Sequence, residues 1–200
     1  GRAVRWTNDG TEILDLGTLK SDNSGNSVAV GLSADGLTIG GQAEMDTANG
    51  SQDVAFVWRE NDGMISLGGL QSDGLGYGVV NWISDDGGVL TGQAINDADE
   101  YRAFQWVDSE TGMRDLGTFR TDNSGDSWAQ GMSADGTTIV GNASSDLDLD
   151  DFDAGRAFLW RDDGNGLLDL GTLKADNSGQ SGAIAASADG SVIVGGAESD

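Results

Sequence analysis

The densest group of acidic side chains lies in the segment "SSDLDLDDFDAGR", residues 144–156, and its chemistry would be that of a cation site. Five aspartates stand close together in it: Asp146, Asp148, Asp150, Asp151 and Asp153. Alternate side chains of an extended segment point to the same side, and crowded carboxylates repel one another unless a cation lies between them. Calcium takes about six to eight oxygen ligands. The segment is therefore the first candidate for a calcium site, and the alternative is a solvated acidic loop.

A second set of oxygen donors recurs in three "DNSG" stretches, where the corresponding fourth stretch reads "SDGLG". The donor pairs are Asp22 with Asn23, Asp122 with Asn123, and Asp176 with Asn177. A hairpin this short offers too few oxygens for a complete calcium site. We therefore expect ordinary Asx turns here in preference to partial metal sites.

Four short turns of the type "SADG" or "SDDG" carry one further aspartate each, namely Asp35, Asp86, Asp135 and Asp189. They are similar to the Asp-box turn of sialidases, but the residue that the Asp-box has between Asp and Gly is missing. An aspartate in such a turn accepts hydrogen bonds from the amides of its own turn. We expect a structural role for all four.

Three arginines occupy one repeated position: Arg2, Arg102 and Arg156. If they converged on a ring axis, they would grip the carboxylate of a ligand, as arginines do in sialidases. Alternatively, each arginine pairs with aspartates near it on the surface. The large excess of aspartates favours pairing.

Four aromatic residues stand where the repeat pattern does not require them. Trp82 and Trp128 have mainly Gly, Val or Ala as counterparts, and Tyr77 and Tyr101 lie in or beside the divergent second unit. Departures from a repeat pattern are places where function tends to appear. These residues are the candidate ligand-binding residues, by stacking on sugar rings, and the alternative is that they fill local gaps.

The overall charge restricts the classes of partner. Thirty-four acidic and ten basic side chains give a formal net charge of −24, which excludes a surface for nucleic acid or anionic lipid. Histidine and cysteine are both absent, so the chain has no zinc-type ligand set, no Ser-His nucleophile and no disulfide. No apolar run has the length of a membrane span, so we expect no direct membrane insertion. Calcium is the expected cofactor, if the protein has one.

The candidate residues are carried by an internal repeat of about fifty residues. Four tryptophans mark it, each three residues after an alanine: Trp6, Trp58, Trp106 and Trp160. An "LG" pair, the "SADG"-type turn and a glycine follow at nearly constant distances. Constant internal spacing with variable ends indicates a tandem array. The units are approximately 1–52, 53–100, 101–154 and 155–200, in one repeat domain.

Each unit has four short apolar stretches separated by turn signals, which predicts a four-stranded antiparallel blade. The chain is thus expected to be all-β, a β-propeller of four tandem blades. The alternatives are an open β-repeat array, part of a larger propeller, or a ring completed by a second chain, which would be a homo-oligomer. Trp58, Trp106 and Trp160 should be buried against the small residues of the third stretch. Gly17, Gly68, Gly117 and Gly171 lie inside a strand pattern and suggest bulges or close backbone approach.

The motifs "RAFLW", "DLGTL", "SADG" and "IVGGA" together resemble the HAF repeats of extracellular bacterial proteins, which occur in autotransporter passenger regions. The resemblance covers essentially the whole chain. It departs from the family where His commonly precedes "AFLW", since Arg2, Val54, Arg102 and Arg156 stand there, and in the longer loop after "DLGTL". The resemblance implies a repetitive β fold and secretion or display at the bacterial cell surface. The chain opens in mid-repeat, as expected of a mature piece.

Three classes of function stay open. The favoured one is a non-catalytic extracellular or cell-surface module for adhesion or for binding a glycan or another host or cell-surface ligand. A glycosidase or sialidase-like enzyme would need two carboxylates about 5 to 10 Å apart, one with a raised pKa, and no acid stands out in that role. A passive spacer in an autotransporter passenger is the third. The expected protein is therefore not an enzyme, and no catalytic residue is assigned.

Overall fold

The computed structural model describes residues 1–110, 112–147 and 155–200. These residues form antiparallel strands and a single 3₁₀ turn, Asn8–Gly10, so helix is nearly absent, as the bias towards Asp over Glu predicts. The strands are β1 (Val4–Thr7), β2 (Glu12–Asp15), β3 (Ser27–Leu32), β4 (Thr38–Thr47), β5 (Gly50–Arg59), β6 (Gly63–Ser66), β7 (Gly78–Ile83), β8 (Val89–Ile95), β9 (Tyr101–Val107), β10 (Arg114–Asp115), β11 (Ser127–Met132), β12 (Thr138–Ser144), β13 (Gly155–Arg161), β14 (Leu167–Asp169), β15 (Ser181–Ala186) and β16 (Ile193–Ala197).

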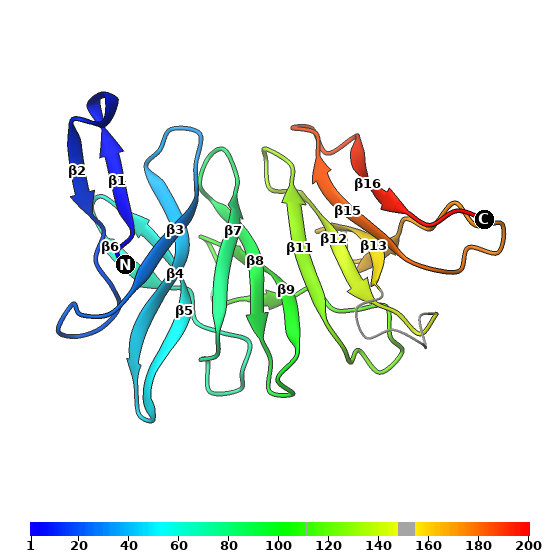
Figure 1. The fold of residues 1–200 in the computed structure, drawn as a ribbon, viewed down its shortest axis with the longest axis horizontal. Coiled ribbons are helices and arrows are strands. Elements are labelled where there is room, and N and C mark those ends of the chain that lie inside the picture. The colour runs from blue at the N-terminus through cyan, green and yellow to red at the C-terminus, as the bar shows by residue number, and fades with distance from the viewer. Residues whose placement is uncertain (111, 148–154) are drawn as a thin grey trace.

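The strands form three complete four-stranded blades, which confirms the expected all-β architecture of antiparallel blades (Figure 1). Blade 1 is β3–β6, blade 2 is β7–β10 and blade 3 is β11–β14, each in sequential strand order. A two-stranded sheet stands at either end: the N-terminal hairpin β1–β2 and the C-terminal hairpin β15–β16. The first strands of the blades, β3, β7 and β11, face the viewer in Figure 1 together with β15. We call the surface that they carry the inner-strand surface.

Each blade combines two consecutive sequence units. In blade 1, β3 and β4 come from the first unit, whereas most of β5 and all of β6 come from the second. The reason is the pairing of β4 with β5, which brings Ile39 opposite Trp58 across the unit boundary. The recurring "AFLW" stretch is therefore the third strand of a blade. Four sequence units yield three complete blades and two hairpins.

The third strand of each blade is buried on both of its faces because blades stack face to face. In β5, Phe56 and Trp58 pack into one core cluster with Ala3 and Leu16, whereas Val57 belongs to the next cluster. Strand alternation thus serves two inter-blade cores at once. The same arrangement recurs in β13, where Phe158 and Trp160 pack into one cluster on one side of the strand and Leu159 packs into the next cluster on the other side.

The same seven repeat positions build each inter-blade core. Between blades 2 and 3 they are occupied by Ala103, Leu116, Ala129, Ile139, Ala143, Phe158 and Trp160. The corresponding residues gather in the two earlier clusters, with Ala29 and Trp106 only partly buried in them. A bulky Phe and Trp from a third strand therefore close a layer of small and aliphatic residues supplied by the preceding strands.

The tryptophans confirm most of the packing prediction. Trp58 and Trp160 are 6% and 2% exposed, and they share clusters with the small residues Ala29 and Ala129 respectively. Trp106 is partly buried against its cluster rather than fully buried. Trp6, at the same repeat position, is 63% exposed because the N-terminal hairpin lacks the two strands that would complete its blade.

The glycines of the "DLG" motif do not lie inside strands, which corrects that part of the sequence interpretation. β2, β10 and β14 end two residues before Gly17, Gly117 and Gly171, whose φ angles are +90°, +91° and +79°. Each glycine lets the chain turn through the left-handed region of backbone conformation, which residues with a Cβ atom rarely adopt. The bulges lie instead in the first strand of each blade, for example between Ala29 and Gly31.

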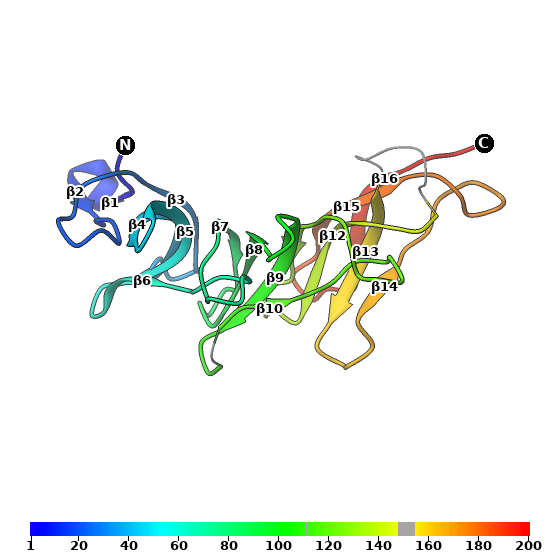
Figure 2. The ribbon, with the colours of Figure 1, turned by 90° about the horizontal axis from the view of Figure 1, so that it is seen from below.

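Backbone hydrogen bonds link one blade to the next through the "SADG"-type turns. The N–H of Ala34 donates to the C=O of Asp85, that of Asp85 to Ala134, and that of Ala134 to Ala188, over 2.7–3.1 Å. The same hydrogen bond therefore links equivalent turns of successive blades. Figures 1 and 2 show the result, an open arc whose N- and C-termini lie at opposite ends. The four units do not close into a ring by themselves.

Candidate functional site

The aspartates of the "SADG"-type turns hold their own turns together. In the third copy the Ser133 hydroxyl donates to the Asp135 carboxylate over 2.6 Å, and the same carboxylate accepts the N–H of Thr137 over 3.0 Å. The other three copies repeat both hydrogen bonds. The expected structural role is confirmed.

These hydrogen bonds also set the acidity of the turn aspartates. The serine hydroxyl, followed by the backbone N–H, lowers the pKa of Asp35, Asp86 and Asp135 below the ordinary value. In Asp189 the hydroxyl of Ser187 is again the largest cause, and the pKa falls to about 2. Carboxylates held in the ionised form in this way do not suit the role of a general acid.

The repeated arginines form ion pairs inside the blades and do not converge on an axis. Arg156, fully buried, donates from Nε and Nη2 to the Asp169 carboxylate and from Nη1 to the C=O groups of Asn177 and Gly179, over 2.9–3.3 Å. Asp169 in turn accepts the N–H of Gly171 over 2.7 Å. The favoured alternative, pairing with aspartates, is thus confirmed: Arg102 and Arg156 make these pairs with fully buried side chains, whereas the pair of Arg2 with Asp15 is partly exposed.

The "DNSG" asparagines complete this network. Asn177, at a φ of +56°, accepts the N–H of Thr172 and the Arg156 Nη2 through its side-chain oxygen. The neighbouring Asp176 accepts the N–H of Ser178, as expected of an Asx turn. The first and third copies repeat these turns. The residue types of three distant motifs are therefore explained by one structural unit, which we call the Arg–Asp–Asn network.

In the second sequence repeat all members of the Arg–Asp–Asn network are replaced together, which confirms that they depend on one another. Val54 stands in place of the arginine, Ser66 in place of the aspartate, and "SDGLG" in place of "DNSG". Val54 is 1% exposed, and the Ser66 hydroxyl still accepts the N–H of Gly68. An apolar residue thus occupies the site when the partners of the charge are absent.

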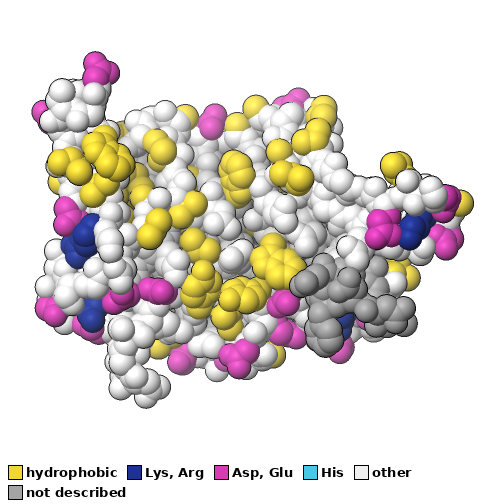
Figure 3. Space-filling view, in the orientation of Figure 1, with side chains coloured by type: hydrophobic (Ala, Val, Ile, Leu, Met, Phe, Trp, Pro, Cys, Tyr) yellow, Lys and Arg dark blue, Asp and Glu magenta, His cyan; other side chains and the backbone are white. Residues whose placement is uncertain are grey.

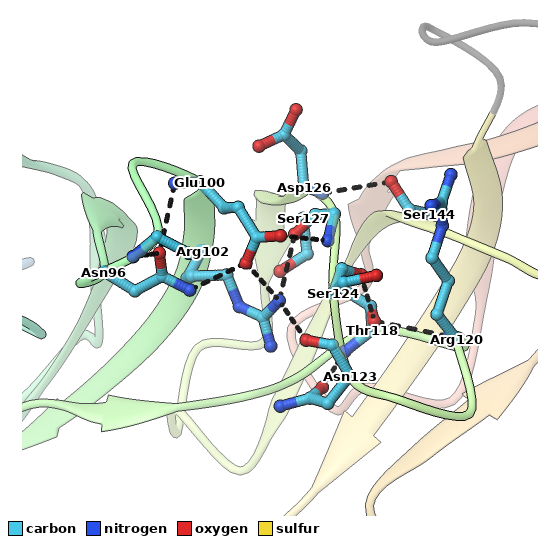
Figure 4. Close-up of polar contacts among 12 residues, drawn as sticks. Asn96, Glu100, Arg102, Thr118, Arg120, Asn123, Ser124, Asp126, Ser127 and Ser144 are labelled. Carbon is cyan, nitrogen blue, oxygen red and sulfur yellow. Dashed lines mark hydrogen bonds and ion pairs between the residues drawn. The ribbon is translucent and has the colours of Figure 1, made fainter.

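The Arg102 copy of the network is the most crowded (Figure 4). Its Nε donates to Asp115, its Nη1 donates to the C=O groups of Asn123 and Gly125, and Glu100 lies 3.7 Å from Nη1. Glu100 also accepts the N–H of Gly125 and the side-chain amide of Asn96. The buried Nη2 of Arg102 has no hydrogen-bond partner among the residues that the structure describes.

The candidate aromatic residues lie on or beside the two central first strands, β7 and β11. Tyr77 precedes β7 and packs edge to face against Tyr101, with ring centroids 6.0 Å apart and an interplanar angle of 86°. Tyr101 opens β9, and its N–H donates to the Asp126 carboxylate just before β11. Burial raises the pKa of the Tyr77 hydroxyl, and the nearby Tyr101 and Asp53 add to this effect.

The two tryptophans lie at different heights along these strands. Trp82 follows the bulge of β7, opposite Thr91, and is 44% exposed. Trp128 is the second residue of β11, opposite Asn142, and is partly buried. Their repeat positions differ by three residues, or about 10 Å along a strand. The structure therefore brings Tyr77 and Tyr101 together as a pair but does not gather the four aromatic residues into one cluster.

A cavity of about 450 Å³ opens on the same surface between blade 3 and the C-terminal hairpin. Its polar lining includes the side chains of Gln130, Asn142 and Gln180, and Ile184 adds an apolar wall. Asn142 is also the cross-strand partner of Trp128, and its amide oxygen accepts a hydrogen bond from Gln130 over 2.6 Å. Figure 3 shows hydrophobic side chains gathered near this region, over the lower parts of β7 to β11. Asn142 shares its repeat position with Gln42 and Gln93, but no pattern in the sequence indicates that Gln130 and Gln180 join it in one cavity.

Of the expected calcium ligands, only Asp146 lies within the described residues. Its carboxylate accepts the N–H and hydroxyl of Thr121 over 2.9 and 2.5 Å, and these hydrogen bonds lower its pKa. Asp46 makes the same contacts with Ser21 in the first unit. Asp148, Asp150, Asp151 and Asp153 fall outside the described residues. Within the described part, no group of three or more acidic side chains has the arrangement of a metal site.

Two further observations concern the described part of the chain. Every carboxyl group for which a pKa shift is resolved there is shifted downward, and none has the raised pKa of a general acid. In those residues no helix has the length and apolar character required to cross a bilayer.

Comparison with known proteins supports the fold. The chain resembles two solved structures: the crystal structure of TolB from Acinetobacter baumannii has a TM-score of 0.52 and 11% identity over 98% of this chain and 43% of its own. A candidate TolB of Agrobacterium tumefaciens has a TM-score of 0.52 and 17% identity over 93% of this chain and 65% of its own. This chain therefore spans less than two thirds of either protein. No protein-family model and no curated protein matches the sequence. At these identities the similarity shows the architecture of the TolB β-propeller domain and nothing of its activity.

Proposed function

We propose that this protein is a non-catalytic extracellular module that binds a neutral glycan on its inner-strand surface. The observation that carries the proposal is the presence of Trp82 on β7 and Trp128 on β11, at positions where the other units have small or aliphatic residues, with Tyr77 and Tyr101 beside these strands. Aromatic faces offer apolar area to a sugar ring at a small cost in conformational entropy. Secretion rests on the resemblance to HAF repeats, which is itself part of this proposal.

The cavity beside Trp128 supports the proposal. Gln130, Asn142 and Gln180 offer amide donors and acceptors of the kind that fix the orientation of a polar, uncharged ligand. The net charge of −24 disfavours anionic glycans, which would be repelled on approach. The ligand class expected from both features is a neutral oligosaccharide.

The test is a glycan array followed by titration of the strongest neutral ligand. Wild-type protein should bind, and Trp128→Ala and Trp82→Ala should each weaken binding about tenfold, since a stacking contact contributes about 1.5 kcal/mol. Ile65→Ala is the matched control, because Ile65 is a 45% exposed apolar residue on the outer strand β6. Binding that is unchanged in both tryptophan variants would contradict the proposed surface.

The array and an assay with glycoside substrates together separate the binding module from a passive spacer and from a glycosidase. A passive spacer would bind none of the glycans, and a glycosidase would release reducing sugar from a panel of glycoside substrates. Glycosidases require one carboxylic acid that stays protonated, and every resolved pKa shift of a carboxyl group in the described part is downward, which favours binding over hydrolysis.

Calcium is proposed as a cofactor on the sequence of the segment from Asp146 to Asp153. If it binds only the folded protein, calcium should raise the melting temperature relative to excess chelator at matched ionic strength. Asp148→Asn combined with Asp150→Asn should remove that difference. An increase that survives both substitutions would place the effect elsewhere, in general screening of the acidic charge.

A further inference from the structure

The amide-lined cavity of about 450 Å³ between blade 3 and β15 owes its hollow shape to two glycines. Gly155, the first residue of β13, and Gly182, on β15, both line it. The earlier contacts between blades have larger residues at these two positions: Tyr101 and Trp128 between blades 2 and 3, and Asp53 and Val79 between blades 1 and 2. The cavity therefore arises from the residue types on two adjoining strands.

Gly155 also leaves room for the amide side chain of Asn142 on β12. A Cβ atom at position 155 would lie 2.9 Å from Nδ2 of Asn142 and 3.3 Å from its Cβ. These distances are too short for an ordinary contact, so any larger residue in place of Gly155 would displace the Asn142 side chain. The glycine therefore keeps this amide in its place in the cavity wall.

A hydrogen bond between two of the lining amides fixes what they offer to a ligand. Nε2 of Gln130 donates to Oδ1 of Asn142 over 2.6 Å. A carboxamide has one acceptor oxygen and one donor nitrogen. The bond therefore leaves Oε1 of Gln130 as an acceptor and Nδ2 of Asn142 as a donor, and neither atom has a hydrogen-bond partner within the described part of the protein.

The rest of the lining is apolar or neutralised. Ile184 is 58% exposed and forms an apolar wall. Among the described lining residues Glu198 is the only ionisable one, and its carboxylate pairs with Nζ of Lys174 over 2.6 Å. The cavity thus suits an uncharged chemical group that combines a hydrogen-bond donor, an acceptor and a small apolar end.

We propose that this cavity binds the acetamido group of an N-acetylhexosamine. Oε1 of Gln130 accepts the N–H of the acetamido group, Nδ2 of Asn142 donates to its C=O, and its methyl group packs against Ile184. Trp128, the cross-strand partner of Asn142, places an aromatic side chain beside the same cavity. The inference rests on the proposed binding of a neutral glycan and names the class of sugar within it.

The test compares pairs of neutral oligosaccharides that differ only in carrying an acetamido or a hydroxyl group at one carbon of each sugar. Chitotetraose and cellotetraose, built with the same linkage from N-acetylglucosamine and from glucose, are one such pair, and the tightest pair on the array is titrated by calorimetry. Wild-type protein should bind the acetamido member at least about tenfold more tightly. The reason is that the hydroxyl member leaves a hydrogen bond and the methyl contact unmade.

Two variants test the roles of the residues. Asn142→Asp keeps the size of the side chain and its acceptor for Gln130 but removes the donor, so the preference for the acetamido member should be lost. Gly155→Ala should reduce the preference as well, because its methyl group displaces Asn142. Gln93→Glu is the matched control, since Gln93 has the repeat position of Asn142 on β8, lies outside the cavity lining and receives the same change of charge.

The outcomes separate this inference from the proposed function. Equal binding of the two members of each pair, or a preference that survives Asn142→Asp, would overturn the inference and leave the binding of a neutral glycan intact. A lack of binding to every neutral glycan would contradict the proposed function and the inference together. Preference for an acetyllysine peptide over all the sugars would assign the cavity to a protein ligand and would also overturn the inference. Circular dichroism shows whether each variant is folded.

Discussion

At the scale of single residues, two of the ten basic side chains stabilise the interior of the blades. Arg102 and Arg156 have fully buried side chains, each held by the aspartate of its network and by two backbone carbonyls, and Glu100 is a second carboxylate beside Arg102. Burying a charge is costly unless it is paired and hydrogen-bonded, so each arginine depends on its partners. The second unit avoids this dependence by replacing the arginine with Val54.

Loss of one partner should therefore cost more than loss of both. Asp169→Ser leaves the buried guanidinium of Arg156 without its carboxylate and should lower the free energy of unfolding by about 3 to 5 kcal/mol. Adding Arg156→Val, which copies Val54 and Ser66, should recover part of that loss. Urea denaturation measures both values. As a control, Asp162→Ser breaks the exposed ion pair with Arg114 and should cost about 1 kcal/mol or less. A double variant less stable than the single one would contradict this account.

The turn aspartates predict a dependence of stability on acid. Hydrogen bonds from Ser187 and Ser191 lower the pKa of Asp189 in the folded state to about 2, below the ordinary 3.8. A depressed folded-state pKa contributes stability that is present above the ordinary value and is lost as the pH falls through the folded value. The urea concentration at the unfolding midpoint should therefore decrease as the pH is lowered from 4 to about 2. This decrease should be smaller in Asp189→Asn. The control is Asp9→Asn, which removes one negative charge from the 3₁₀ turn. If the dependence of the urea midpoint on pH changed equally in both variants, the hydrogen bonds of Asp189 in its turn would not be the cause.

At the scale of elements, a blade depends on its third strand, which faces two neighbouring cores. The strand contributes a Phe and a Trp to one core and an aliphatic residue to the next, as Phe56, Trp58 and Val57 do. Such a strand needs a complete sheet beside it, which explains why the same sequence motif is buried in β5 and exposed in β1.

The two tryptophans at this position should therefore differ in their contribution to stability. Trp58→Ala should lower the free energy of unfolding by about 3 to 5 kcal/mol, because it opens a cavity in a packed core. Trp6→Ala should cost less than about 1 kcal/mol when measured at a protein concentration too low for association, since Trp6 is 63% exposed. Denaturant titrations of both variants test this comparison. Equal losses would mean that β1 is packed in solution as β5 is.

At the scale of the whole molecule, the net charge of −24 opposes both compactness and association. Raising the ionic strength from about 0.02 M to about 0.5 M shortens the Debye length from roughly 20 Å to about 4 Å. The melting temperature should rise over this range. Sodium chloride and tetramethylammonium chloride at equal ionic strength should act alike, because the effect is screening rather than binding. A melting temperature that is independent of salt would contradict this prediction.

The sequence by itself determined the repeat, the antiparallel strands and the hairpin turns, because alternation, glycines and Asx residues act locally. It also predicted the burial of Trp58 and Trp160, since a bulky apolar side chain at a fixed repeat position requires a core. It did not determine which strands share a sheet. That choice depends on the pairing of β4 with β5 across a unit boundary, which no local pattern specifies.

Only the tertiary structure decided the roles of the polar residues. Arg156, Asp169 and Asn177 lie 13 and 8 residues apart in sequence, and their separate motifs favoured an ion pair and an Asx turn but did not indicate that the three residues form one network. Their meeting depends on where the loops after β14 and before β15 fold back. The amide-lined cavity beside Trp128 likewise exists only once blades are stacked, because residues of different strands form it together.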